Sequence, residues 1–429
     1  MANEAILPLD LAKAVIDPHA YGEWDGLLDK FDHIRTTMPV AKVVPEDGTL
    51  FEPFWFISRY DDVKRISKDN ETFLNNPRPV VFAFNQAIEF SRAATGSNML
   101  VDSLVVFDAP VHPKYRRLTQ DWFMPKNLRQ IEDEIRELAT RTVDNMIANG
   151  PELDFVETVS GPYPLRVVMQ ILGVPPEDEP RMQMLTQQLF GGQDKDLSGS
   201  GMDKMTPEQV VQLVAGAVST FEDYFAKLAE DRRADPTDDV ASVIANAMVD
   251  GKPLPPRDMA GYYIIVATAG HDTTSASTAG AMQALAQDPD QWARVREDRS
   301  LLPGIVEEAI RWTSPVQHFM RTAARDVEIG GQHIRKGDWM MINYVSANHD
   351  PDQFDDPRRF DAARSPNRHM AFGAGAHQCL GLHLARLEMR ILFEALLDRV
   401  VAVELAGQPQ RANSTFVGGL KSLPLKITV

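Results

Sequence analysis

The chain has a single cysteine, Cys379, in the glycine-rich segment FGAGAHQCLG, residues 372–381. Glycines at these positions permit tight turns and close approach of the backbone to a flat, bulky group. Leucines and isoleucines at helical spacing follow, so the thiol is expected near a helix N-terminus, where backbone N–H groups favour a thiolate. A lone thiolate without partners at metal spacing argues against zinc or an iron–sulfur cluster, and no CxxCH is present. Haem ligated by a thiolate fits best, and a buried, inert cysteine is the alternative.

This segment resembles the haem-binding loop of the cytochrome P450 monooxygenases, with the pattern Phe-x-x-Gly-x-His-x-Cys-x-Gly. The resemblance implies that Cys379 ligates the iron of haem b. It also implies that Phe372, Gly373, His377 and Gly381 lie against the cofactor. The family more often has arginine where this chain has His377, and either side chain can donate a hydrogen bond to a haem propionate.

A second motif, AGHDTT at residues 269–274, lies in a helix expected over residues 256–288. Taken alone, it favours helix packing with hydroxyls bonded to carbonyls four residues earlier. It resembles the family's Ala/Gly-Gly-x-Asp/Glu-Thr motif, which implies that Ala269 and Gly270 leave room above the haem for O₂. Thr273 is then expected to bind O₂ or a water, and Asp272 to connect that place to solvent protons. The histidine of the motif is interpreted as structural or outward-facing.

A set of charged residues before the cysteine loop also matches the family in order and spacing. Glu308 and Arg311 form an Glu-x-x-Arg motif, which with Arg364 implies a scaffold for the haem loop and no catalytic role. An ordinary ion pair on a helix surface is the alternative for such a motif.

The family uses a His-x-x-x-Arg pair and a second arginine for the haem propionates, which correspond here to His112, Arg116 and Arg321. Together with His377 they would neutralise two carboxylates in apolar surroundings. A solvated basic turn is the alternative for the first pair.

The resemblance also implies a class of substrate and the residues that line its pocket. Residues 269–274, 311–313, 319–323 and 366–369 are similar to a bacterial subfamily that hydroxylates α-terpineol. The implied substrate is small, apolar and cyclic, either a monoterpenoid or an aromatic hydrocarbon. Five residues are expected to line its pocket by their places in the family pattern: Ile265, Val316, Phe319, Phe416 and Val417.

The elements that hold these motifs are mostly helical. Apolar residues recur at helical spacing over 128–147 and 210–225, whereas strand-like runs are limited to 55–57, 327–329, 339–342 and 425–429. No long linker divides the chain, which predicts one domain over residues 1–429. The expected fold is mainly α with small β-sheets, and the resemblance places haem between a long distal helix and the cysteine-loop helix. A turn-rich segment, residues 191–201, is expected to be a mobile loop.

Composition restricts partners and compartment. A net charge of −17 argues against nucleic acid and against an anionic membrane surface. Neither a signal peptide nor a membrane span is expected, and one cysteine suits the reducing cytoplasm. Because no flavin or nicotinamide domain is apparent, electrons are expected from a two-iron ferredoxin and its NADH-dependent reductase. Docking is expected at four basic residues: Lys114, Arg117, Arg386 and Arg390.

Two other functions are alternatives to an O₂-dependent monooxygenase. One keeps the haem but uses peroxide or isomerises its substrate, and Asp272 with Thr273 argues against it because peroxide supplies its own oxygen and protons. The other is a non-catalytic haem protein or gas sensor, for which the chain offers no fused signalling domain.

Overall fold

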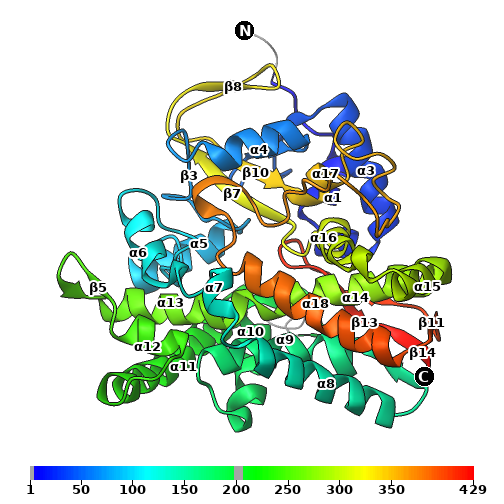
Figure 1. Ribbon diagram of the computed structural model, residues 1–429. Helices are drawn as coiled ribbons and strands as arrows, with labels where there is room; N and C mark the ends of the chain where they lie inside the picture. Colours follow the sequence, from blue (N-terminus) through cyan, green and yellow to red (C-terminus); the bar gives the residue numbers. More distant parts are fainter. Residues whose placement is uncertain (1–3, 198–205) are drawn as a thin grey trace.

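The computed structural model describes residues 4–197 and 206–429 (Figure 1). A strand-rich part that includes the N-terminal segment lies at the top of the view, above a larger helical part. The helices are α1 (Leu9–Ile16), α2 (Pro18–Gly22), α3 (Trp24–Thr37), α4 (Tyr60–Lys68), α5 (Asn85–Thr95), α6 (Val111–Gln120), α7 (Pro125–Leu128), α8 (Glu132–Ala148), α9 (Pro162–Ile171), α10 (Glu179–Phe190), α11 (Pro207–Ala234), α12 (Val240–Ala245), α13 (Pro256–Ala269), α14 (His271–Gln287), α15 (Pro289–Glu297), α16 (Leu302–Thr313), α17 (Tyr344–Asn348) and α18 (Leu382–Arg399).

The strands form one five-stranded sheet, one three-stranded sheet and three hairpins within the described residues. The largest sheet has the order β1-β2-β10-β7-β3, in which β10 pairs parallel to β2 and antiparallel to β7. The strands are β1 (Val40–Val43), β2 (Phe54–Ile57), β3 (Phe73–Leu74), β4 (Glu152–Asp154), β5 (Met248–Val249), β6 (Lys252–Pro253), β7 (His318–Ala323), β8 (Val327–Ile329), β9 (Gln332–Ile334), β10 (Trp339–Asn343), β11 (Ala402–Leu405), β12 (Gln410–Arg411), β13 (Leu420–Ser422) and β14 (Pro424–Thr428).

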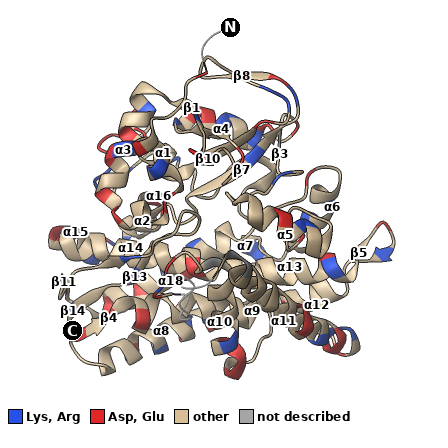
Figure 2. Ribbon diagram, turned by 180° about the vertical axis from the view of Figure 1, so that it is seen from behind, with Lys and Arg blue, Asp and Glu red and all other residues tan. Residues whose placement is uncertain are grey.

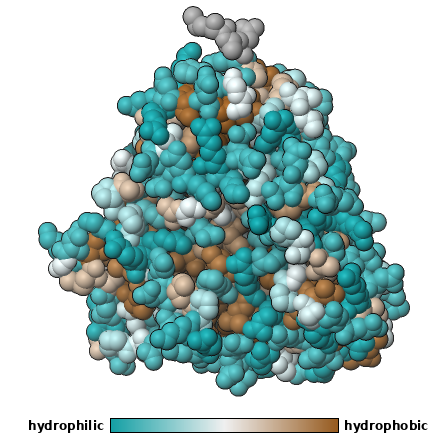
Figure 3. All heavy atoms as spheres, turned by 45° about the horizontal axis from the view of Figure 1, so that its top comes forward, coloured by the Kyte–Doolittle hydropathy of each residue, from teal (hydrophilic) through white to brown (hydrophobic). Residues whose placement is uncertain are grey.

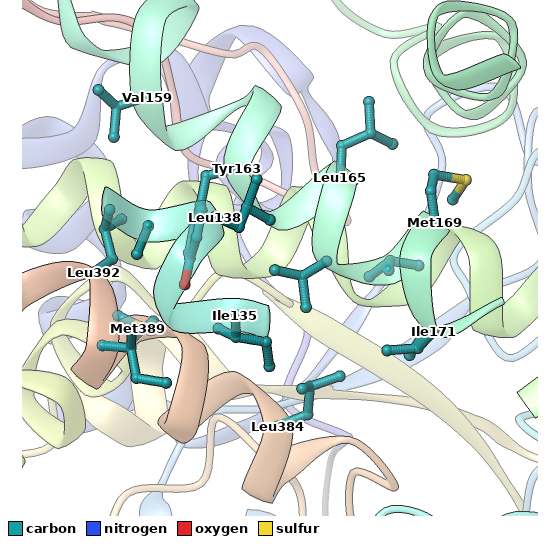
Figure 4. Close-up of a cluster of buried hydrophobic side chains, with 14 of the residues drawn as sticks. Ile135, Leu138, Val159, Tyr163, Leu165, Met169, Ile171, Leu384, Met389 and Leu392 are labelled. Carbon is teal, nitrogen blue, oxygen red and sulfur yellow. The ribbon is translucent and has the colours of Figure 1, made fainter. Parts of the chain in front are cut away.

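Helix α18 is held in the helical part by its packing against α8 and α16, within an apolar cluster to which α9 also contributes. Apolar residues on its inner face recur at helical spacing, as the sequence predicts. Figure 4 shows this cluster, in which the labelled residues are Ile135, Leu138, Val159, Tyr163, Leu165, Met169, Ile171, Leu384, Met389 and Leu392. The Tyr163 hydroxyl also donates to the Glu388 carbonyl at 3.0 Å. This packing fixes the helix that follows the cysteine loop.

The predicted mainly helical fold with small sheets is confirmed, and the predicted strand-like runs lie in β2, β8, β10 and β14. The helix expected over residues 256–288 is broken at Gly270 into α13 and α14. Glycine weakens a helix locally because it leaves the backbone free of side-chain restraint. Similarly, the apolar pattern over 128–147 is divided between α7 and α8.

Part of the segment expected to be a mobile loop, residues 198–201, lies outside the described residues. In the described part, Asp194 is 1% exposed and accepts a hydrogen bond from the Asn413 backbone at 2.8 Å. Lys421 adds an ion pair with Asp194 at 3.0 Å. This stretch therefore contacts the C-terminal hairpin through Asp194, and the mobility expected for residues 191–201 stays a prediction.

Charged residues of both signs alternate along the same helices in Figure 2, so the net charge of −17 is not gathered in one element. The face in Figure 3 is mostly hydrophilic, with hydrophobic residues gathered near its centre. None of the helices within residues 4–197 and 206–429 combines the length and apolar composition needed to cross a bilayer.

Candidate active site

A cavity of about 240 Å³ lies between the distal helices α13 and α14 and the cysteine loop that precedes α18. Ile265, Ala269 and Thr273 line it from the helices, and Phe372 and Cys379 line it from the loop. Segments more than a hundred residues apart in the sequence thus meet around one space. The two motifs that the sequence analysis singled out lie on its two sides.

The cysteine loop is closed by its own backbone. The Cys379 N–H donates to the Phe372 carbonyl at 2.8 Å. Gly373 and Gly375 have φ values of +67° and +75°, which side chains rarely adopt. A Cβ on Gly375 would also lie 2.7 Å from the Ser67 carbonyl oxygen of α4. Both glycines are therefore required by the conformation of the loop.

Cys379 itself is half-buried, and its thiol faces the cavity. Burial raises the pKa of the thiol, whereas a hydrogen bond from the Gly381 N–H and the charges of Arg116 and Arg386 act in the opposite direction. Gly381 also lines the cavity, and a Cβ there would meet no protein atom within 4 Å. Open space is thus available beside the sulfur.

Four basic side chains, His112, Arg116, Arg321 and His377, line one end of this cavity, here called the basic end. The rings of His112 and His377 lie 4.0 Å apart between centroids. His112 is 3% exposed, and its Nε2 has no hydrogen-bond partner among the described residues. Neither arginine forms an ion pair with a carboxylate in the described parts of the chain, and Arg321 donates to its neighbour's carbonyl at 2.8 Å.

The pKa shifts at the basic end show an uncompensated positive environment. Burial, followed by the charge of Arg116, lowers the pKa of His112 to about 4. Burial and then the charges of His112, Arg321 and Arg116 lower the pKa of His377 to about 2. Burial also lowers the pKa of both arginines. Buried charges are normally paired, so this end of the cavity is built for a ligand with negative groups.

Haem fits these observations. Its two propionates would supply the missing partners of the basic end, including the orphaned His112 Nε2, and its flat ring would take the space beside Gly381. Within the described residues, no group of three or more His, Cys, Asp or Glu side chains could hold a bare metal ion. A metal held by the single thiolate of Cys379 would therefore need a macrocycle for its other bonds.

The distal side is formed at the break between α13 and α14. A Cβ on Gly270 would lie 2.8 Å from Val168 Cγ2 of α9, so the glycine permits the close contact of these helices. The Thr273 hydroxyl donates to the Ala269 carbonyl at 2.9 Å, which leaves its oxygen able to accept a hydrogen bond from a water.

Asp272 does not line the cavity. Its side chain is 35% exposed, and its Oδ1 lies 2.8 Å from Nε2 of His271. His271 is buried, which agrees with the structural role expected for it, but its partner is the carboxylate of the motif. The side chain of Asp272 is thus partly exposed to solvent, whereas that of the next residue, Thr273, lines the cavity.

Glu388 was missed by the sequence analysis. It lines the cavity from α18, is 1% exposed, and accepts a hydrogen bond from Thr274 Oγ1 at 3.1 Å. Burial raises its pKa well above the ordinary value, and the hydrogen bond from Thr274 acts in the opposite direction. The signal was available, because a glutamate stands four residues after Leu384 on an otherwise apolar helix face.

The expected substrate-pocket residues divide into two groups. Ile265, Val316 and Phe319 line the cavity, whereas Phe416 and Val417 do not. Phe416 packs behind Phe319, with ring centroids 5.5 Å apart, and Val417 forms a β-bridge with Val316. These two residues support the wall from outside because the bridge directs their segment along the back of residues 316–319.

Glu308 is the centre of a hydrogen-bonded network, here called the Glu308 network, with Arg311, Arg364 and Asn367. Both Glu308 and Arg311 are 0% exposed, and two hydrogen bonds of 2.8 Å join them. Arg364 and Asn367 donate to the same carboxylate at 3.0 Å. Arg311 also donates to the carbonyls of residues 348 and 357 at 2.8 Å. The network ties α16 to the segment before the cysteine loop.

Comparisons with known proteins agree with this geometry. The family model described as Cytochrome P450 matches residues 50–429. Cytochrome P450-terp of Pseudomonas sp is 40% identical over the whole of both chains, and linalool 8-monooxygenase of Pseudomonas putida is 33% identical over 92% of this chain and 94% of its own. The crystal structure of CYP108D1 from Novosphingobium aromaticivorans DSM12444 is 61% identical and superposes with a TM-score of 0.92, over 99% of each chain.

Proposed function

The chain belongs to the cytochrome P450 family of haem-thiolate monooxygenases with haem b, and we propose that it hydroxylates a small apolar, cyclic molecule with Cys379 as the iron ligand. When bound, thiolate-ligated haem activates O₂ for insertion of one oxygen atom into the substrate. The observation that carries the proposal is the pairing of one thiol with an uncompensated basic end in a single cavity. The whole chain, residues 1–429, is proposed to form one domain.

Each set of residues has a distinct part in this function. The basic end would hold the two propionates, and Gly373 and Gly381 would admit the flat ring to the sulfur. Ala269 and Gly270 would leave space on the distal side. Asp272 would exchange protons with solvent. Thr273 would hold a water in the cavity by accepting a hydrogen bond from it, and this water would deliver the protons.

A monoterpenoid or an aromatic hydrocarbon is the proposed substrate class. The cavity wall opposite the loop is apolar, with Ile265, Val316 and Phe319 as contacts, so it offers few hydrogen bonds to a polar ligand. The names of two relatives, Cytochrome P450-terp and linalool 8-monooxygenase, support a terpenoid substrate for the present chain.

Electrons are proposed to come from a two-iron ferredoxin with an NADH-dependent reductase, in the cytoplasm. Among the four expected docking residues, three are already paired in the described structure: Lys114 with Asp250, Arg386 with Glu307, and Arg390 with Glu132 and Glu394. The Arg117 side chain contacts the Pro113 carbonyl and has no carboxylate partner there. Arg117 is therefore the strongest docking candidate of the four.

The test is turnover with a ferredoxin and its NADH-dependent reductase, compared with peroxide alone, for compounds that shift the Soret spectrum. Product formed with O₂ and NADH, and little with peroxide, is the expected result. Efficient turnover with peroxide alone would favour a peroxide-driven oxygenase, and binding without any product would favour a non-catalytic haem protein.

Thr273→Ala tests the proton path in the same assay. We expect substrate binding to persist while product per NADH consumed falls severalfold. Thr268→Ala is the matched control, because Thr268 makes the same bond to the carbonyl four residues earlier, at 2.7 Å, but does not line the cavity. Equal coupling in the two variants would place the proton path elsewhere.

A further inference from the structure

A second carboxylate on α16, Glu307, organises a cluster at the outer side of the cysteine loop. Glu307 accepts hydrogen bonds from Arg386 at 2.5 and 2.8 Å and contacts His369 Nε2 at 3.2 Å. The Arg386 guanidinium lies 4.7 Å from the centroid of the Phe372 ring, and the His369 ring lies 5.7 Å from it. We call Glu307, His369, Phe372 and Arg386 the Glu307 cluster.

The hydrogen bonds of this cluster fix the state of its members. His369 Nδ1 accepts from the Ala371 N–H at 3.3 Å, so the ring proton is on Nε2 and is donated to Glu307. Burial alone would raise the pKa of Glu307, but the hydrogen bonds from His369 and Arg386 and the charge of Arg386 lower it to about 2. Glu307 is therefore a permanent anion that holds two side chains at once.

The Glu307 cluster is connected to Cys379 through Phe372. Phe372 lines the cavity, and its carbonyl accepts from the Cys379 N–H at 2.8 Å. A cation close to an aromatic face restrains the ring. The positive charge of Arg386 also acts on the Cys379 thiol, whose pKa it lowers. Arg386 is 35% exposed and Glu307 27% exposed, so this contact is accessible from the surface groove lined by Glu307, Arg386 and Arg390.

We propose that Glu307 is a positioning residue that holds Arg386 against Phe372 and thereby sets the electrostatic environment of the Cys379 sulfur. This inference rests on Cys379 being the haem ligand. Glu307 touches neither the cavity nor the thiol, and it acts through Arg386 and the loop. The positive charge near the sulfur stabilises the reduced, more electron-rich state of the site.

Arg390 provides a matched control on the same helix. It is 34% exposed, against 35% for Arg386, and it is likewise ion-paired, with Glu394 at 2.7 Å and Glu132 at 3.0 Å. It lines the same groove but not the cavity, and its carboxylate partners are different. Loss of either arginine removes an ion-paired positive charge from α18, and the two should cost similar stability.

The experiment uses the haem-loaded protein and measures its ferric–ferrous reduction potential in Arg386→Gln, Arg386→Lys and Arg390→Gln. We expect a more negative potential in Arg386→Gln, a value near wild type in Arg386→Lys, and no change in Arg390→Gln. A shift in Arg390→Gln as large as that in Arg386→Gln would overturn the proposal, because the effect would then be one of general surface charge.

A double-mutant cycle of Glu307→Gln and Arg386→Gln tests whether the two residues act together. The readout is the rate at which the reduced protein with carbon monoxide loses its thiolate-type Soret band in mild denaturant. The two effects should be non-additive by at least about threefold, as for residues in contact, and additive effects would contradict the proposal. Absence of the thiolate-type band in wild type would contradict the proposal that Cys379 ligates the haem. That result is distinct from additive effects, which would contradict only the role of Glu307.

Discussion

The Glu308 network and the basic end of the cavity both bury charge, but they differ in how that charge is partnered. In the Glu308 network one carboxylate at 0% exposure meets two arginines and an amide. At the basic end two arginines and two histidines face a cavity, with no carboxylate ion-paired to either arginine among the described residues. Partnered buried charge serves the fold, whereas unpartnered buried charge indicates the place of a ligand.

The largest expected effect is at the Glu308 network. Glu308→Gln leaves the fully buried Arg311 and the partly buried Arg364 without their carboxylate, which should lower the free energy of unfolding by about 3–5 kcal/mol. Urea denaturation of the haem-free protein measures this change. Asp144→Asn, which breaks the exposed pair with Arg399, is the control and should cost about 1 kcal/mol or less. A loss as small as the control's would mean that the network does not hold the fold.

The opposite behaviour is expected at the basic end. Arg321→Gln removes a buried charge that forms no ion pair with a carboxylate among the described residues, so the haem-free protein should be no less stable. Loss of haem to an acceptor apoprotein should be about 10- to 100-fold faster, because hydrogen bonds to charged groups contribute about 1.5–3 kcal/mol. If Arg321→Gln destabilised the haem-free chain as strongly as Glu308→Gln, the distinction between the two regions would be lost.

The histidines at the basic end predict a pH dependence with a defined sign. The pKa of His112 is lowered to about 4 in the folded chain from an ordinary value of 6.5. Its neutral form therefore supports folding above pH 6.5, and this support is lost as the pH falls towards 4, because only the unfolded chain takes up the proton. By pH 5 the haem-free protein should lose about 2 kcal/mol through this group.

His112→Gln should remove about 2 kcal/mol of that dependence, as measured by urea denaturation at pH 7.5 and pH 5, while His377 keeps its own contribution because its pKa is lowered as well. The same slope in wild type and variant would show that His112 is not buried as a neutral ring. Bound haem should also reduce the slope, since a propionate would favour the protonated ring.

The sequence predicts the elements that carry repeated local patterns. The helix after Cys379 and the strands over residues 327–329 and 339–342 follow from apolar periodicity and flanking glycines. Strand β7 was not predicted, because its polar residues His318, Arg321 and Thr322 interrupt the apolar run and are buried by tertiary contacts. The close approach of Val168 from α9 to Gly270 is a tertiary contact that no local pattern reveals.

The candidate site shows the same division. The order and spacing of the motifs predict that Cys379, Thr273 and the basic end share one site, although each motif alone is ambiguous. In the structure they line one cavity. The partners of Glu307 lie 62 and 79 residues away in the sequence. Glu307 itself directly precedes Glu308 of the Glu-x-x-Arg motif and belongs to no motif of its own. Contacts between side chains that are distant in sequence and lack a shared pattern could not be predicted.

The smallest expected effect concerns charge at the surface. Arg117→Gln removes a cation without a carboxylate partner in the described structure, and it should slow ferredoxin-dependent reduction by a few-fold at low salt and little at high salt. Arg390→Gln removes a paired cation and should change the rate less. Stopped-flow reduction at several ionic strengths checks both. Identical salt dependence in the two variants and wild type would place the docking surface elsewhere.

The absorption spectrum of the reduced protein with carbon monoxide tests the central claim most directly, because it reports the iron ligand itself. Wild type should show the thiolate-type Soret band, and Cys379→Ser should lose it while the haem-free chain remains folded. Arg390→Gln, in the same preparation, should keep it. A thiolate-type band that persisted in Cys379→Ser would contradict the assignment of the cavity as a haem-thiolate site, since the chain contains no other cysteine.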